Sequence, residues 1–188
     1  GAGSIARLVQ WRPVAKGDGV FIPAGTIHAI GAGIVVAEIQ QRGDATFRLF
    51  DYGRQRDLHE DNAVAAADAG PVQTLCHPPR RTGARTVLIA SRHFVLERID
   101  LPEHSSWVLF ADAVTWIYVL NGPGAFGLLS ASIGDAIFVG RDNTSTEVGP
   151  HGLNEPIAYP GPNPIRSRVH SPGRAAHHPT SPPAVPAT

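Results

Sequence analysis

Short apolar runs alternate with turn-forming residues over the first fifty positions of the chain. Three of these runs are rich in β-branched and aromatic side chains, and they span residues 20–22, 34–39 and 46–50. Glycine, proline and aspartate separate them, which is typical of short strands and tight turns in an all-β barrel or sandwich. A strand over 46–50 would place Arg48 on the opposite face from Phe47. Inside a barrel, that guanidinium would need a carboxylate or phosphate partner.

The pattern changes to that of a helix between residues 57 and 68. Asp57 stands three positions before Glu60, as in a capping box, and an alanine-rich stretch without glycine or proline follows. Gly70-Pro71 would end the helix. We therefore expect one short helical segment, followed by a connector over 76–84.

A second block of strand-like sequence follows the connector. Its runs lie at residues 85–90, 93–101, 107–120, 125–129 and 136–139. Trp107 and Trp116 fall within these runs, and we expect both to pack in the core rather than to serve as carbohydrate platforms.

The two blocks share a short repeat. Residues 134–139 (Gly-Asp-Ala-Ile-Phe-Val) match the pattern of residues 17–22 (Gly-Asp-Gly-Val-Phe-Ile). Its position before a strand in both blocks favours an internal duplication. Extending the alignment without gaps places Ser145 opposite His28. We therefore expect the second block to lack a ligand at this position and to be structural.

The sequence after residue 161 has the composition of a disordered tail. Residues 162–188 are rich in proline, serine, histidine and arginine and carry few apolar side chains, so they cannot bury enough surface to offset the entropy of ordering. His170, His177 and His178 lie in this tail and could bind transition metals weakly. We interpret the tail as solvated and without function.

Composition and charge exclude several classes of protein. Lys and Arg together number 16 and Asp and Glu together number 16, which gives a formal net charge of zero and no electrostatic case for nucleic acid or an anionic membrane. No apolar run approaches the ~20 residues that span a bilayer. The single cysteine, Cys76, excludes an internal disulfide framework and fits a reducing, cytoplasmic compartment. The chain contains no methionine, so we expect an N-terminal portion to precede Gly1.

The strongest candidate for chemistry is His28. It follows Pro23 and Gly25, which define a sharp corner after a predicted strand. A metal ligand needs a fixed imidazole angle, and such a corner supplies one. A lone histidine among apolar neighbours is more often a core residue, so both interpretations follow from this pattern alone.

Several motifs around His28 resemble, in order, the signature of type I mannose-6-phosphate isomerases. They are Lys16-Gly17-Asp18, the run 23–31 that contains Gly-Thr-Ile-His-Ala, Glu38-Ile39-Gln40-Gln41, the run 44–54, and Leu58-His59. More faintly, the second block is similar to that family's degenerate C-terminal cupin domain. The resemblance implies an all-β double cupin of two jelly-roll β-barrels with one short helix between the β blocks. The metal-binding cupin domain and the helix would occupy 1–75, and the second, degenerate cupin domain would occupy 85–161.

The resemblance also implies an activity, the zinc-dependent isomerisation of mannose 6-phosphate to fructose 6-phosphate through an enediol. In that family a Gln-x-His pair, a glutamate and the histidine of the Gly-Thr-x-His-Ala corner hold the zinc. His28 matches the last of these, and no Gln-x-His occurs in this sequence. We therefore expect the other zinc ligands upstream of Gly1 and expect this chain alone to be inactive.

Three further residues match family positions near the substrate. Arg48 matches an arginine that faces the substrate, where it would anchor phosphate or stabilise the enediolate, and its alternative role is a salt bridge to Asp44 or Asp51. Glu38 and Asp44 match acidic positions and are candidates for the catalytic base or for orienting another group. On residue type alone, either carboxylate could equally be a solvated strand end.

Two other functions remain open from the sequence. One is a non-enzymatic cupin module for sugar binding or assembly, and the other is a cupin that recruits a different metal through the tail histidines. The expected partner is a small sugar phosphate, and neither nucleic acid nor a membrane is expected. The sequence predicts no oligomeric state.

Overall fold

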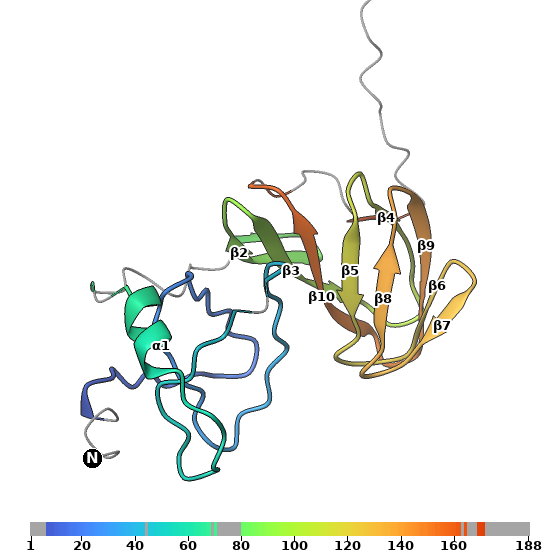
Figure 1. Cartoon of the computed structure of the whole chain (residues 1–188). Helices are drawn as coiled ribbons and strands as arrows, with labels where there is room; N and C mark the ends of the chain where they lie inside the picture. The colour runs from blue at the N-terminus through green and yellow to red at the C-terminus, as the bar shows by residue number, and fades with distance from the viewer. Residues whose placement is uncertain are drawn as a thin grey trace, which may run out of the picture. The chain divides into compact units, whose positions relative to one another are not determined.

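The computed structural model describes residues 7–43, 45–68, 70, 80–162, 164 and 169–171 of the chain. Within these residues the structure contains one helix, α1, and strands β1 to β11 (Figure 1). The predicted all-β class with one short helix is therefore confirmed. The described helix is too short to cross a membrane.

The chain divides into two compact units. The first consists of Gly1–Thr82, Thr86–Glu97 and Pro160–Pro164, and the second consists of Gly83–Arg85, Arg98–Tyr159 and Ile165–Thr188. Residues 76–79 of the predicted connector lie outside the described residues, and its described part, residues 80–84, includes the strand β1 (Arg80–Thr82).

The predicted strands of the first block are not formed. Between residues 7 and 68 the described chain contains no strand, and the runs 20–22, 34–39 and 46–50 follow irregular paths. A strand requires a neighbouring strand to accept and donate its backbone hydrogen bonds, and these runs have no such neighbour within the described chain. Several of their apolar side chains are exposed, among them Val35, which is 99% exposed, whereas others such as Phe21 and Leu49 are half-buried.

The helix α1 spans Glu60–Ala66, with His59 at its N-cap position and no side-chain cap. The predicted capping box with Asp57 as the cap is therefore wrong. The helix start is fixed instead by the backbone, because the N–H of His59 donates to the carbonyl of Arg48 at 2.9 Å and the N–H of Ala63 donates to His59 at 2.8 Å. Glu60 and Asp61 in the first turn complement the positive end of the helix dipole.

The strands of the second block form two sheets. Their order is β1-β2-β3-β10-β5-β8 in the larger sheet and β11-β4-β9-β6-β7 in the smaller one. The strand bounds are β2 (Arg85–Ala90), β3 (Phe94–Leu101), β4 (Ser106–Phe110), β5 (Thr115–Tyr118), β6 (Gly124–Phe126), β7 (Leu129–Ala131), β8 (Ala136–Val139), β9 (Asn143–Val148), β10 (Leu153–Pro160) and β11 (Val169–His170). The run 107–120, which was expected to be continuous, is broken between β4 and β5. Residues 169–170, which the sequence placed in the tail, pair with β4.

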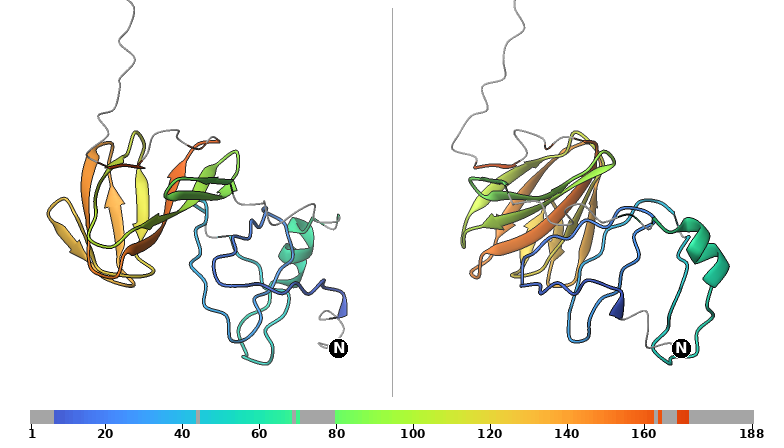
Figure 2. Two further views of the ribbon diagram at one scale, coloured as in Figure 1. Left: turned by 180° about the vertical axis from the view of Figure 1, so that it is seen from behind. Right: turned by 90° about the vertical axis from the view of Figure 1, so that its left-hand side faces the viewer.

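The core of the second unit lies between its two sheets (Figures 1 and 2). Ile117 on β5 and Ile137 on β8 are register partners, and both are buried. The next pair in the register, Trp116 and Phe138, lies on the opposite face, where the side chains are 52% and 54% exposed. This alternation is expected for a sheet with one buried face, and it shows that the predicted core role of Trp116 is wrong. Trp107 is half-buried.

The internal repeat has a structural counterpart in a four-residue turn that occurs once in each block. Gly17 and Gly134 have φ angles of 96° and 95°. In the first turn the N–H of Asp18 donates to the carbonyl of Ala15 at 3.1 Å, and the N–H of Ala15 donates to the Asp18 carboxylate at 2.8 Å. The second turn repeats both bonds between Asp135 and Ser132, at 3.0 and 2.8 Å. The two sequences therefore specify the same local geometry, as an internal duplication predicts.

Candidate functional site

His28 lies at the corner that the sequence predicted. The N–H of Thr26 donates to the carbonyl of Pro23 at 3.1 Å, which closes a tight turn, and Gly25 within this turn has a φ of 85°. The carbonyl of Gly25 accepts the N–H of Asp68 at 2.9 Å. This bond ties the corner to the segment just after α1, so the position of His28 depends on the helix.

The imidazole of His28 is exposed, and one of its nitrogens is already engaged. Its Nδ1 lies 2.9 Å from the carbonyl oxygen of Thr26. A carbonyl can only accept a hydrogen bond, so Nδ1 carries a proton, and in the neutral ring Nε2 keeps a free lone pair. Metal-binding histidines commonly show this arrangement, in which a backbone carbonyl fixes the ring. His28 is not a core histidine, and it fits the role of a metal ligand.

The described residues do not complete a metal site around His28. No group of three or more His, Cys, Asp or Glu side chains in this part of the chain could hold a metal ion. Zinc takes three or four protein ligands, so His28 alone would not complete a zinc site.

The side chain of Arg48 contacts two neighbours in the first unit. Its Nε lies 3.7 Å from the carboxylate of Asp51, and its Nη1 donates to the carbonyl of Asp57 at 2.9 Å. The Asp51 salt bridge is one of the alternatives considered from the sequence. His59 also contacts Arg48, because its Nδ1 accepts the backbone N–H of Arg48 at 3.3 Å. Arg48 is therefore held between the Asp51 loop and the start of α1.

Three arginine side chains surround the carboxylate of Asp51. Arg56 contacts it through a salt bridge from Nη2 and a hydrogen bond from its backbone N–H at 2.8 Å, and Nε of Arg54 lies 3.8 Å away. Burial acts to raise the pKa of Asp51, but the hydrogen bonds and charge of Arg56, together with the charge of Arg54, outweigh burial and hold the pKa below its usual value. The carboxylate therefore stays ionised and orients the guanidinium groups. We call Asp51, Arg48, Arg54 and Arg56 the arginine cluster.

The backbone of this loop is strained. Tyr52 and Gln55 have φ angles of 51° and 59°, a region that costs non-glycine residues of the order of 1–3 kcal/mol each. The loop is closed by a hydrogen bond from the N–H of Arg54 to the carbonyl of Asp51 at 3.1 Å. Strain of this kind persists only where surrounding contacts fix the chain, and here the Asp51 contacts do so.

For Glu38 and Asp44, the two candidates for the catalytic base, the structure gives little evidence of a role. Glu38 is exposed, which is compatible with a base that faces solvent or substrate and equally with a solvated carboxylate. Asp44 lies outside the described residues. The structure brings Arg48 together with Asp51 and Asp57, whereas the hydrogen bond of His28 stays within its own corner.

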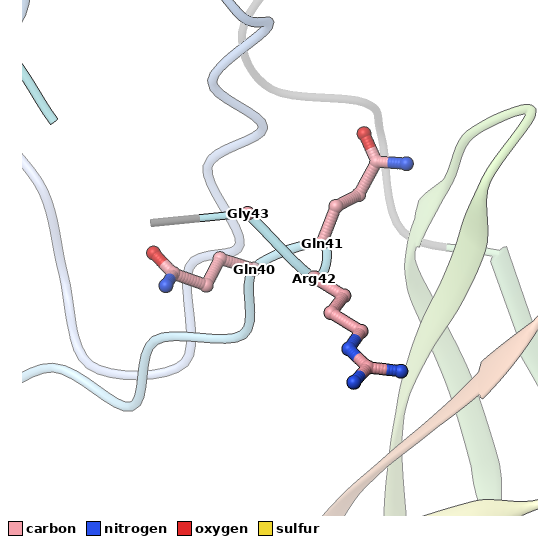
Figure 3. Close-up of a pocket in the computed structure, with 4 residues that line it drawn as sticks. All are labelled: Gln40, Gln41, Arg42 and Gly43. Carbon is pink, nitrogen blue, oxygen red and sulfur yellow. The ribbon is translucent and has the colours of Figure 1, made fainter. Parts of the chain in front are cut away.

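An open hollow in the first unit is lined by Gln40, Gln41, Arg42 and Gly43 (Figure 3). In Figure 3 the three long side chains point in different directions. A small-molecule site needs polar groups that converge on one point. The arginine cluster meets this requirement better than the hollow does.

The second unit contains a buried carboxyl group. Glu155 on β10 is 2% exposed, and among the described residues its Oε2 has no hydrogen-bond partner. Burial raises its pKa to about 8. Glu155 is therefore mostly protonated at neutral pH, which makes it an uncharged part of the core.

Sequence reasoning did not identify Arg54, Arg56 and Glu155. A signal for the first two was present, because three arginines lie between residues 48 and 56 with Asp51 as the one acidic residue among them. Glu155 gave no comparable signal, since burial depends on how the sheets pack.

Sequence comparison identifies relatives over about half of the chain. The chain is 35% identical over 103 residues to the mannose-6-phosphate isomerase of Streptococcus mutans serotype c, a match that covers 50% of this chain and 33% of the relative. It is 32% identical over 111 residues to mannose-6-phosphate isomerase ManA of Bacillus subtilis, covering 54% of this chain and 34% of the relative. The chain thus spans about a third of the length of these curated relatives. No family model matches it.

Structure comparison gives partial likenesses to solved proteins. An oxalate decarboxylase from Lactobacillus farciminis aligns with a TM-score of 0.45 at 12% identity, covering 55% of this chain and 38% of that one. The polyketide cyclase RemF from Streptomyces resistomycificus aligns with a TM-score of 0.39 at 22% identity, covering 50% and 74%. An RmlC-like cupin from Methanocaldococcus jannaschii aligns with a TM-score of 0.38 at 12% identity, covering 50% and 94%.

Proposed function

We propose that this chain is part of a mannose-6-phosphate isomerase, an enzyme that interconverts mannose 6-phosphate and fructose 6-phosphate. The observation that carries the proposal is the 35% identity over 103 residues to the Streptococcus mutans enzyme. The hydrogen-bonded corner of His28 adds support, since it holds a candidate ligand with one ring nitrogen free.

The reaction moves a proton between C1 and C2 of the sugar, so it requires a base, a group that stabilises the developing oxygen charge, and an anchor for the phosphate. Glu38 and Asp44 are the proposed candidates for the base. Arg48 is proposed to stabilise the enediolate or to bind the phosphate, because a guanidinium can donate two hydrogen bonds to either group.

Zinc is the proposed cofactor, and Nε2 of His28 would hold it together with ligands from outside the described residues. Bound zinc would act as a Lewis acid toward the substrate oxygens. The role of His28 itself is to present a neutral nitrogen at a fixed angle, with Thr26 holding the proton on Nδ1.

The proposed function can be tested by supplying the other proposed zinc ligands from a relative. The chain is coexpressed with the part of the Streptococcus mutans isomerase that lies outside the matched segment, and mannose 6-phosphate turnover is measured. We expect the chain alone to be inactive and poor in zinc, and the combination to be active. His28→Ala should abolish the restored activity, whereas Ser145→Ala, at the aligned position of the second block, should not. A stable complex without turnover would contradict the proposal.

A sugar-binding module is the second candidate function. Trp116 and Phe138 favour it, because their exposed rings lie 4.9 Å apart in an edge-to-face pair on one sheet face. Exposed aromatic rings offer apolar faces to a sugar. Titration of mannose against tryptophan fluorescence, with Trp116→Ala as the variant, tests this function. A mannose affinity that Trp116→Ala abolishes, without isomerase activity in the combination above, would favour the module.

A further inference from the structure

We propose that the edge strand β8 is an interface between two copies of this chain, which pair antiparallel across a two-fold axis at Phe138. The inference goes beyond the proposed function and does not depend on it. The pairing joins the larger sheets of two second units into one continuous sheet, and it leaves the outer face of that sheet open to solvent.

The first argument is that β8 (Ala136–Val139) has a free edge. It is the last strand of the larger sheet, and β5 is its one partner among the described strands (Figure 1). The carbonyl of Asp135 accepts the N–H of Val119, the residue that follows β5. Successive residues of a strand direct their backbone groups to opposite sides, so those of Ala136 and Phe138 point away from β5. These groups are therefore available to another strand.

The second argument is that the composition of β8 does not protect this edge. Natural edge strands are commonly blocked by lysine, proline or inward-pointing charges, whereas β8 consists of Ala, Ile, Phe and Val. Ile137 and Val139 are buried, and Ala136 and Phe138 are exposed. The open edge is thus bordered by an apolar surface, and an edge of this kind favours pairing with another strand.

The third argument is charge complementarity, which selects both the partner and the register. Identical strands that pair antiparallel are related by a two-fold axis. If Phe138 meets Phe138 of the second copy, Asp135 of each copy lies opposite Arg141 of the other, and both residues are exposed. Centring the pair on Ile137 instead would place Asp135 opposite Val139. The register at Phe138 therefore joins unlike charges at both ends of the strand pair.

The fourth argument is the packing of aromatic rings. Phe138 is the register partner of Trp116 on β5, and the two rings form an edge-to-face pair with centroids 4.9 Å apart. Pairing at Phe138 would place two such pairs side by side on one sheet face. Cross-strand aromatic neighbours of this kind stabilise a sheet, so the second copy offers the exposed ring of Phe138 a matching surface.

The experiment measures the mass of the full chain by sedimentation equilibrium over a series of concentrations. We expect the parent to approach twice its monomer mass of 19.9 kDa. Phe138→Lys and Phe138→Glu should each raise the dimer Kd at least tenfold, because two like charges would face each other across the axis. Leu128→Lys is the matched control, since this side chain is 103% exposed and lies outside β8. It should change the Kd less than twofold.

An equimolar mixture of the Phe138→Lys and Phe138→Glu chains tests the register itself. The two introduced charges are opposite and would face each other across the axis, so the mixture should dimerise at least tenfold more tightly than either variant alone. A parent that stays monomeric at about 100 μM, where a Kd of about 1 μM would leave mostly dimer, would overturn the proposal. So would a mixture that associates no better than its components, when all chains give far-UV circular dichroism spectra like that of the parent.

Discussion

Arg56 contacts both oxygens of the Asp51 carboxylate, because its backbone N–H donates to Oδ2 at 2.8 Å while its guanidinium contacts Oδ1. One residue thus holds the carboxylate through both main chain and side chain. The other two arginines of the cluster are placed around this pair, so the order of the loop depends on it.

The first prediction concerns acid stability. The folded state holds the pKa of Asp51 below its ordinary value of 3.8, so ionised Asp51 stabilises the fold above that pH, and this contribution is lost as the pH falls through the lowered pKa. Asp51→Asn should therefore destabilise the first unit at pH 6 and cost less as the pH falls below about 4. Urea unfolding followed by tyrosine and tryptophan fluorescence measures this. An equal cost at pH 6 and pH 3 would contradict it.

The second prediction concerns Glu155. Its pKa rises from 4.5 to about 8 in the folded state, so the folded protein binds a proton that the unfolded chain releases. The contribution of Glu155 to stability should therefore be fully present below pH 4.5 and should be lost as the pH rises toward 8, with a total loss of the order of 5 kcal/mol.

Glu155→Gln is the matched variant, since it keeps the shape of the side chain and removes the titration. It should be more stable than the parent at pH 8 and nearly independent of pH between 5 and 8. Denaturant midpoints of the second unit at these pH values test this. A parent protein whose midpoint does not change over that range would exclude the raised pKa.

The third prediction concerns the corner of His28. Gly25→Ala should be destabilising by about 1–3 kcal/mol, because a left-handed backbone disfavours a Cβ and the new Cβ would lie 3.0 Å from the carbonyl oxygen of Ala66. Gly33→Ala is the control, since Gly33 has a similar φ of 78° with nothing within 4 Å of its Cβ. Helix content measured by circular dichroism should fall more for Gly25→Ala. Equal effects would show that the contact with Ala66 is unimportant.

The fourth prediction tests which face of β5 is buried. Ile117 is 1% exposed, so Ile117→Ala should cost about 2–5 kcal/mol. Trp116→Ala on the opposite face removes a larger side chain but should cost less, because half of that side chain is already in solvent. Chemical unfolding of both variants gives the comparison. A greater loss for Trp116→Ala would show that this face is covered in solution.

The second block was more predictable from sequence than the first. β2 and β8 were placed with their observed bounds, because their continuous apolar runs pair with neighbouring strands. β9 and β10 were missed, since Asn143–Val148 is largely polar and Leu153–Pro160 contains two prolines; pairing in the sheet overrides these weak propensities. In the first block the residues have high β propensity, but no hydrogen-bonded strand pairs form among the described residues.

The candidate site divides in the same way. His28 was predictable because glycine and proline fix its corner locally. The arginine cluster was not predictable, since it forms when a strained loop folds back on Asp51. In this loop Tyr52 and Gln55 adopt positive φ angles, which sequence patterns do not predict for these residue types. The corner of His28 was therefore visible in the sequence, whereas the fold of the loop that brings the three arginines onto Asp51 was not.

The repeated Gly-Asp turn places two comparable backbone amides in the chain, one in each block. The amides of Asp18 and Asp135 donate to carbonyls at nearly equal distances within turns of the same geometry. Their intrinsic hydrogen-exchange chemistry is therefore closely similar, and any difference in measured protection reports on the surrounding unit rather than on the turn. Comparing these two amides by exchange would measure, within a single molecule, how much less firmly the first block is held than the second.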